Sequence, residues 1–237
     1  METAAEEYNA KERDMATFNQ IEVFQKIEAT GMVPVFYHPD AEVAFAVVKA
    51  CYDGGVRAFE FTNRGDFAQD IFAQVSKRAR RECPDLALGV GTVIDAPTAA
   101  LYLQMGADFV VSPLLNAEVA RVCHRRCVPY VPGCATVSEV SQAQELGCYL
   151  IKCFPGSVLT PKFVSDLRAP LPWSRLMVTG GVAPTEESLS AWFKAGVTSV
   201  GMGSKLFPHD RVAAGDWQYI TDKCQEALTI IRKVREA

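Results

Sequence analysis

Eight strand-like segments, each followed by a helix-forming segment, predict that this chain folds as an α/β protein, a single-domain (β/α)8 TIM barrel. The units follow one another every roughly 20 to 30 residues, as βα units do in a parallel sheet. No composition shift or linker interrupts the series. The length of 237 residues also suits one barrel, which typically needs roughly 250.

The elements can be assigned in order along the chain. Residues 1–16 are charged and rich in alanine, which predicts a flexible N-terminal arm before a barrel domain over residues 17–237. Apolar residues recur at helical spacing over residues 18–29, so a helix ending near Gly31 is expected before the first strand. The predicted strands are residues 33–37, 57–61, 86–90, 108–111, 129–131, 149–153, 175–178 and 198–200.

Helix boundaries follow from capping residues and glycines. A helix is expected from Asp40 to the Gly54-Gly55 pair, another over residues 66–82, and a long closing helix over residues 216–236. Glycine favours the left-handed backbone that ends many helices. The glycines expected to end helices before the even-numbered strands are Gly55, Gly106, Gly147 and Gly196.

Composition excludes several classes of function. The net charge of −4 and the absence of a basic run argue against nucleic acid or an anionic membrane as the main partner, so a bound anion should be small. Neither a secretory signal nor a membrane-length apolar stretch is present, which predicts a cytoplasmic protein. The eight cysteines are expected to be thiols, and those of the cluster Cys123, Cys127 and Cys134 to be buried. The cluster lacks a partner pair at zinc spacing, so neither metal nor cofactor is expected.

Lys152 is unusual because it stands inside a strand that otherwise reads as buried. Desolvation disfavours the ammonium form, so some neutral amine is expected near neutral pH, and a neutral amine attacks carbonyl groups. The alternative is a structural lysine whose charge is paired or reaches the surface.

Glu60, between Phe59 and Phe61, is as unusual on the second strand as Lys152 is on the sixth. Catalytic groups of such barrels come from the carboxyl ends of strands, and even-numbered strands share interior layers. The two side chains could therefore face each other as an ion pair or, with water between them, as a proton shuttle. A buried ion pair adds little net stability, which favours catalytic roles for both.

Glycine motifs end the last two strands. Thr179-Gly180-Gly181 and Gly201-Met202-Gly203-Ser204 are typical of a phosphate site, because glycines let backbone N–H groups approach the oxygens. Tight turns without a ligand are the alternative interpretation.

The sequence resembles the class I 2-keto-3-deoxy-6-phosphogluconate (KDPG) aldolases, many of which also act on 4-hydroxy-2-oxoglutarate. The resemblance extends from about Val33 to Phe207. Its motifs are Gly54-Gly55-Val56, Phe59-Glu60-Phe61-Thr62, Gly89-Val90-Gly91-Thr92-Val93, Val111-Ser112-Pro113, Pro132-Gly133, Ile151-Lys152-Cys153-Phe154-Pro155-Gly156, Thr179-Gly180-Gly181-Val182 and Gly201-Met202-Gly203-Ser204.

The resemblance implies a metal-independent aldehyde-lyase of the Entner–Doudoroff pathway, commonly a homotrimer. It would cleave KDPG to pyruvate and glyceraldehyde 3-phosphate, and 4-hydroxy-2-oxoglutarate to pyruvate and glyoxylate. Lys152 would form a Schiff base with the 2-keto acid, and Glu60 would act as acid and base through water. The residues implied to hold the keto acid are Arg64, Thr92, Pro113 and Phe154, and those implied to hold the phosphate are Thr179, Gly180, Gly181, Gly201, Gly203 and Ser204.

One position departs from the family. Many relatives carry arginine at the end of the first strand, where this chain has Tyr37 followed by His38. Tyrosine offers one hydroxyl in place of a bidentate fork, and His38 could compensate. The preferred substrate therefore stays open, with another 2-keto-3-deoxy sugar acid, such as the 6-phosphogalactonate or an unphosphorylated acid, as alternatives. A non-catalytic phosphate-binding barrel and a metal-dependent aldolase are disfavoured by Lys152 and Glu60 and by the lack of a histidine cluster.

Overall fold

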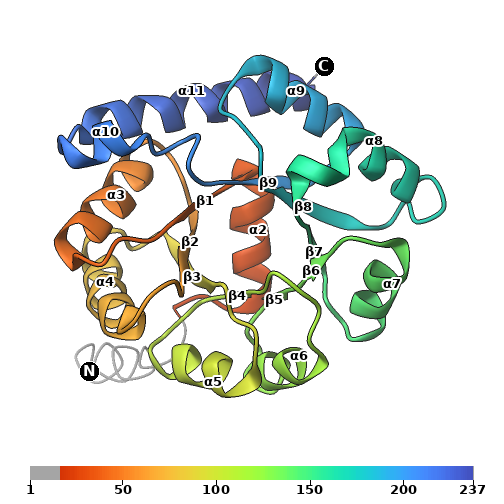
Figure 1. Ribbon diagram of the computed structural model, residues 1–237, viewed down its shortest axis with the longest axis horizontal. Helices are drawn as coiled ribbons and strands as arrows, with labels where there is room; N and C mark the ends of the chain where they lie inside the picture. The colour runs from red at the N-terminus through yellow and green to blue at the C-terminus, as the bar shows by residue number, and fades with distance from the viewer. Residues whose placement is uncertain (1–16, 237) are drawn as a thin grey trace, which may run out of the picture.

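Parallel strands surrounded by helices form a nearly closed barrel in the computed structural model, which describes residues 17–236 (Figure 1). The predicted TIM barrel is confirmed. The arm expected over residues 1–16 lies outside the described residues.

The barrel has eight strand positions, one of which is interrupted. In hydrogen-bonding order the strands are β5-β4-β3-β2-β1-β9-β8-β7-β6, and β5 and β6 at the two ends of this order flank Pro132 in the chain. Proline has no N–H to donate, but its carbonyl accepts a hydrogen bond from Lys152 N at 2.8 Å. The strands are β1 (Met32–Phe36), β2 (Ala58–Thr62), β3 (Ala87–Gly91), β4 (Val110–Val111), β5 (Tyr130–Val131), β6 (Gly133–Cys134), β7 (Leu150–Cys153), β8 (Arg175–Thr179) and β9 (Ser199–Met202).

The four helices whose bounds the sequence indicated, α2, α3, α4 and α11, begin and end within two residues of those bounds. Asp40 caps α3 through its side chain, and all four glycines expected to end helices have positive φ, between 83° and 98°. The short helix α10 was not predicted. The helices are α2 (Gln20–Thr30), α3 (Ala41–Asp53), α4 (Ala68–Glu82), α5 (Ala96–Gln104), α6 (Ala117–His124), α7 (Val137–Glu145), α8 (Gly156–Arg168), α9 (Glu186–Ala195), α10 (His209–Ala213) and α11 (Trp217–Glu236).

Helix α2 closes the amino end of the barrel. Its buried residues Val23, Phe24 and Ile27 pack against side chains near the starts of the strands, and α2 lies across the middle of the ring in Figure 1. Asp108, 3% exposed, ties the chain before α2 to the sheet by accepting from Thr17 N at 2.6 Å and Leu88 N at 2.9 Å. Burial raises the pKa of Asp108 to about 6.

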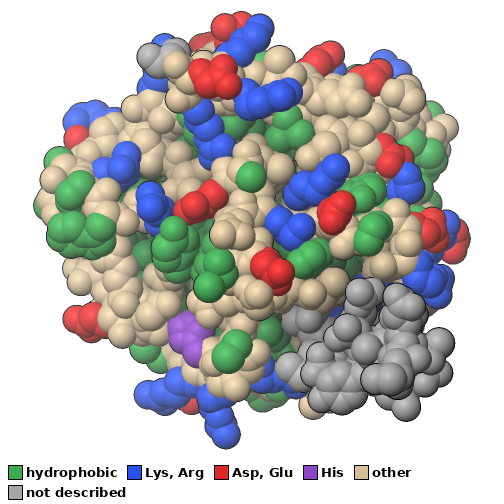
Figure 2. All heavy atoms as spheres, turned by 180° about the vertical axis from the view of Figure 1, so that it is seen from behind, with side chains coloured by type: hydrophobic (Ala, Val, Ile, Leu, Met, Phe, Trp, Pro, Cys, Tyr) green, Lys and Arg blue, Asp and Glu red, His purple; other side chains and the backbone are tan. Residues whose placement is uncertain are grey.

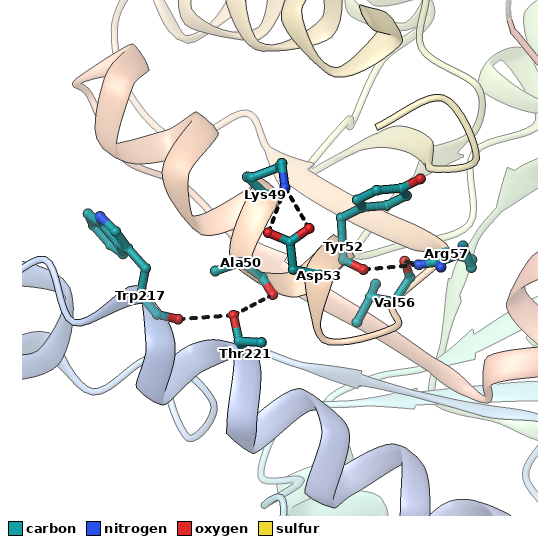
Figure 3. A network of polar contacts seen from close by, with 8 residues as sticks. All are labelled: Lys49, Ala50, Tyr52, Asp53, Val56, Arg57, Trp217 and Thr221. Carbon is teal, nitrogen blue, oxygen red and sulfur yellow. Dashed lines mark hydrogen bonds and ion pairs between the residues drawn. The ribbon is translucent and has the colours of Figure 1, made fainter. Parts of the chain in front are cut away.

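Helix α11 packs against α3 and closes the outer layer (Figure 3). Thr221 Oγ1 donates across this contact to the carbonyl of Ala50 at 3.0 Å. Lys49 and Asp53 form an ion pair within α3 nearby. At the end of α3, Arg57 donates to the carbonyls of Tyr52 and Val56. The predicted closing helix is therefore part of the packed barrel.

The surface fits the charge pattern of the sequence. Figure 2 shows Lys and Arg side chains interspersed with Asp and Glu, with no large area of one sign on this face. No helix in the described residues is long and apolar enough to cross a membrane. All eight cysteines are free thiols, but the prediction of burial is wrong for Cys127, which lies exposed after α6 with a φ of 55°. The described residues contain no cluster of three or more potential metal ligands.

Candidate active site

A cavity of about 430 Å³ opens at the carboxyl ends of the strands, opposite α2. Its lining carries two cations, Arg64 and Lys205, and no carboxylate from the described residues. Glu60, Lys152, Thr92 and Pro113 lie outside the lining. The sequence-predicted residues that do line it are Arg64, Phe154, Thr179, Gly180, Gly181, Gly201, Gly203 and Ser204.

Lys152 and Glu60 face each other in the interior beside this cavity. Lys152 projects from β7 and Glu60 from β2, with Nζ and Oε1 3.7 Å apart, and the residues are 5% and 1% exposed. This distance is too long for a direct hydrogen bond. No described protein group hydrogen-bonds Glu60 Oε2, so the carboxylate retains the capacity to accept a proton or a hydrogen bond from a bound molecule.

Glycines on neighbouring strands make room for the pair. A Cβ atom at Gly91 would lie 1.8 Å from Glu60 Oε1, so only glycine fits beside this carboxylate. Gly133 stands next to Lys152 in the register of β6 and β7. On the cavity side, the ring of Phe154 lies 5.1 Å from Lys152 Nζ, within cation–π range. Because Phe154 lines the cavity, the lysine lies directly behind its wall.

Arg64 and Thr92 come together from two adjacent loops. The exposed Arg64 reaches from the β2–α4 loop, and its Nε donates to Thr92 Oγ1 at 3.5 Å. Thr92 has a φ of 63°, a left-handed conformation that non-glycine residues adopt at an energetic cost and mostly at functional sites. Pro113 does not join them: its carbonyl packs against Gly133, where a Cβ would lie 2.3 Å from it.

The second group of predicted residues surrounds the other side of the cavity. Gly180 and Gly181 have φ of 99° and 77°, and without side chains they allow a ligand to approach the backbone of this turn closely. Thr179 is 8% exposed and lines the cavity among glycines, which have no side chain to pair with it. Its Oγ1 has no hydrogen-bond partner among the described residues. A Cβ at Gly201 would lie 2.3 Å from this hydroxyl. The arrangement leaves a buried hydroxyl available to a ligand's oxygens.

Sequence reasoning missed two polar residues of the lining. Lys205 follows directly after the Gly201–Ser204 motif, so its place at the end of the last strand was the signal that could have identified it. Thr62, buried at the end of β2, reads in sequence as an ordinary strand residue. Tyr37 lines the cavity, whereas His38 does not: its Nδ1 accepts from Asp40 N at 3.1 Å.

A family model and individual relatives both match most of this chain. The family described as "KDPG and KHG aldolase" matches residues 23–223. The 2-dehydro-3-deoxy-phosphogluconate aldolase of Treponema pallidum is 32% identical over 212 residues, covering 89% of this chain and 98% of that protein. The 2-dehydro-3-deoxy-6-phosphogalactonate aldolase of Escherichia coli is also 32% identical, covering 82% and 89%.

Among solved structures, a KDPG aldolase from Legionella pneumophila superposes with a TM-score of 0.76 at 25% identity, covering 85% of this chain and 96% of that one. That structure holds pyruvate captured at low pH as a covalent carbinolamine intermediate.

We expect the Lys152–Glu60 pair to be dispensable for folding. Lys152→Met leaves a buried carboxylate without its cation and should lower the free energy of unfolding by about 3 kcal/mol. Adding Glu60→Leu removes both desolvation penalties and should return stability to within about 1 kcal/mol of the wild type. Urea unfolding of the three proteins measures this. A double variant as unstable as the single one would show that the pair holds the barrel together.

Proposed function

Because the chain belongs to the KDPG and KHG aldolase family, we propose that it is a class I aldolase in which Lys152 forms a Schiff base with a 2-keto acid. The observation that carries this proposal is the buried amine 3.7 Å from a buried carboxylate, one oxygen of which has no described partner. Neither charge is needed at these strand positions for packing, since burying an ion pair brings little net stability.

The proposed reaction uses these two groups in sequence. Lys152 Nζ adds to the C2 ketone, and loss of water gives a protonated imine that draws electrons from the neighbouring bonds. Glu60, directly or through a water, takes the proton of the C4 hydroxyl as the C3–C4 bond breaks. An aldehyde leaves, and the enamine of pyruvate remains on Lys152. Protonation at C3 and hydrolysis of the imine then release pyruvate and restore the free amine.

The two ends of the substrate require different contacts. The guanidinium of Arg64, with Thr92 Oγ1 beside it, suits the carboxylate of the keto acid, while Phe154 covers the imine. We assign Pro113 a supporting role in shaping the keto-acid site from the β4–α6 loop. No metal is required in this scheme, because the protonated imine supplies the electron sink.

A phosphate suits the far end of the cavity. Thr179 Oγ1, Ser204 and the turns formed by Gly180, Gly181, Gly201 and Gly203 offer hydrogen-bond donors, and Lys205 adds a positive charge. A cavity with cations and no described carboxylate in its lining favours a substrate that is anionic at both ends.

We propose KDPG as the substrate, cleaved to pyruvate and glyceraldehyde 3-phosphate as in the Entner–Doudoroff pathway, with 4-hydroxy-2-oxoglutarate as a smaller substrate. The second candidate is 2-keto-3-deoxy-6-phosphogalactonate, which differs in configuration at C4. It is a candidate because the phosphogalactonate aldolase is 32% identical to this chain, as is the phosphogluconate aldolase. Tyr37, which stands in the cavity lining where many relatives carry arginine, is a departure that does not choose between the two.

We also propose a homotrimer. Exposed apolar side chains lie at the carboxyl face, where a second copy could cover them. Phe67, Ile94 and Leu114 lie on the loops that follow β2, β3 and β4, and Val158 lies in the first turn of α8; Phe67 is 70% and Val158 71% exposed.

A panel of 2-keto-3-deoxy acids assayed for pyruvate release tests the proposed activity. The wild type should release pyruvate from the phosphorylated gluconate, the galactonate or both. Glu60→Gln, which keeps the shape of the side chain, should lower kcat by about 10²-fold or more through loss of the proton acceptor. Near-normal turnover in this variant would exclude Glu60 as the acid and base, and no pyruvate from any acid would exclude the activity.

The role of Lys205 is testable separately. Lys205→Met keeps most of the length of the side chain and removes its charge. We expect kcat/KM for 2-keto-3-deoxy-6-phosphogluconate to fall about tenfold, the effect of losing one charge-assisted contact, while kcat/KM for the same acid without its phosphate is unchanged. Equal losses on both substrates would show that Lys205 does not sense the phosphate.

A further inference from the structure

We propose that Tyr102 is a positioning residue: from the helical layer, its hydrogen bond to Asn63 fixes the β2–α4 loop so that Arg64 is held ready for the carboxylate of the keto acid. This inference rests on the proposed function and deepens it, because it identifies what orders the arginine.

The β2–α4 loop lacks the usual support at the start of a helix. Phe67 at the N-cap of α4 makes no side-chain capping bond, has a φ of 60° and is 70% exposed. Asn63 is instead held on two sides: its backbone N–H donates to Gly91 O at 2.8 Å, and its Oδ1 accepts from Tyr102 Oη at 2.8 Å. Arg64 is the next residue along the chain.

Tyr102 is held rigidly enough to serve as an anchor. It lies on α5 with 1% exposure, and its ring packs edge-on against that of Phe72, with the ring centroids 5.2 Å apart. Phe72 contacts Phe61 at 5.7 Å, and Phe61 contacts Tyr37 at 5.6 Å, so four aromatic rings connect the helical layer to the cavity wall. Burial raises the pKa of Tyr102 to about 12, which keeps its hydroxyl protonated and able to donate near neutral pH.

Tyr37 confines the same loop from the cavity side. A Cβ at Gly65 would lie 2.7 Å from Tyr37 Oη, and Gly65 has a φ of 136° that other residues rarely adopt. Arg64 therefore lies in sequence between Asn63, which Tyr102 anchors, and Gly65, which packs against Tyr37. The tyrosine at the end of the first strand thus acts on the loop that carries Arg64.

This arrangement should affect binding more than turnover. A long arginine side chain loses conformational freedom when it binds an anion, and an ordered loop reduces that cost beforehand. The carboxylate of the keto acid does not change during C–C cleavage, so its contact with Arg64 is equal in the ground and transition states. Weakening such a contact raises the substrate concentration required and leaves the maximal rate unchanged.

Pyruvate with cyanoborohydride tests this without a sugar acid, because reduction traps the imine on Lys152 in proportion to its occupancy. In Tyr102→Phe, we expect the pyruvate concentration for half-maximal labelling to rise about threefold to tenfold, with complete labelling at saturation. Asn63→Ala removes the acceptor of the same bond and should give the same shift. Tyr149→Phe is the control, since its hydroxyl bonds Glu28 at the opposite end of the barrel and its loss should cause no shift.

A double variant separates positioning from general loosening. If Tyr102 acts through Arg64, then Tyr102→Phe should cause no further shift in an Arg64→Met background. If the shifts caused by Tyr102→Phe and Arg64→Met multiply in the double variant, the two residues act independently and the inference is overturned. It is also overturned if neither Tyr102→Phe nor Asn63→Ala changes the pyruvate concentration for half-maximal labelling, or if the Tyr149→Phe control shifts it equally. A wild type that pyruvate does not label would overturn the proposed function and this inference together, whereas normal wild-type labelling with no shift would overturn this inference alone.

Discussion

The desolvation of one ammonium and one carboxylate inside an apolar barrel is the constraint on which the rest of the site depends. Lys152 and Glu60 lie on strands whose other residues are buried and mostly apolar, so bulk water stabilises neither charge as it would at the surface. At 3.7 Å they compensate each other only in part. A barrel core that carries this cost without a packing advantage is suited to a reaction in which amine and carboxylate exchange protons with a bound molecule.

The surrounding fold divides its tasks between rigid and adaptable parts. Strands β2 and β7 hold the two groups proposed to react, and glycine at position 91 leaves the space that the Glu60 carboxylate occupies. Helix α2 closes the amino end, so the pair is approached from the carboxyl end. Loops at that end carry the cations proposed to bind the substrate's anionic groups, with Arg64 and Lys205 on different loops of the cavity wall. Under the proposed function, this separation would let the loops change substrate preference while the strands keep the chemistry.

Much of the fold could be predicted because its signals are local. Periodic apolar residues and helix-ending glycines determine the elements one at a time. Glu60 and Lys152 were expected to face each other because they lie on the second and sixth predicted strands, and even-numbered strands share interior layers. Features that depend on distant contacts could not be read this way. The break at Pro132 depends on which neighbours pair with each half of the strand, and the Tyr102–Asn63 bond joins residues from different βα units. The residue type of Lys205 does not distinguish it from other exposed lysines; only its place directly after the Gly201–Ser204 motif does. The exposure of Cys127 depends on how α6 ends.

The most direct test of this account is the site of covalent capture. The intact protein is incubated with pyruvate and borohydride, digested, and each modified peptide is located by mass spectrometry. The account predicts one reduced pyruvyl adduct per chain, on Lys152, and no adduct in Lys152→Met. A protein that stays unmodified, or an adduct on another lysine such as Lys205, would contradict a buried amine as the reacting group.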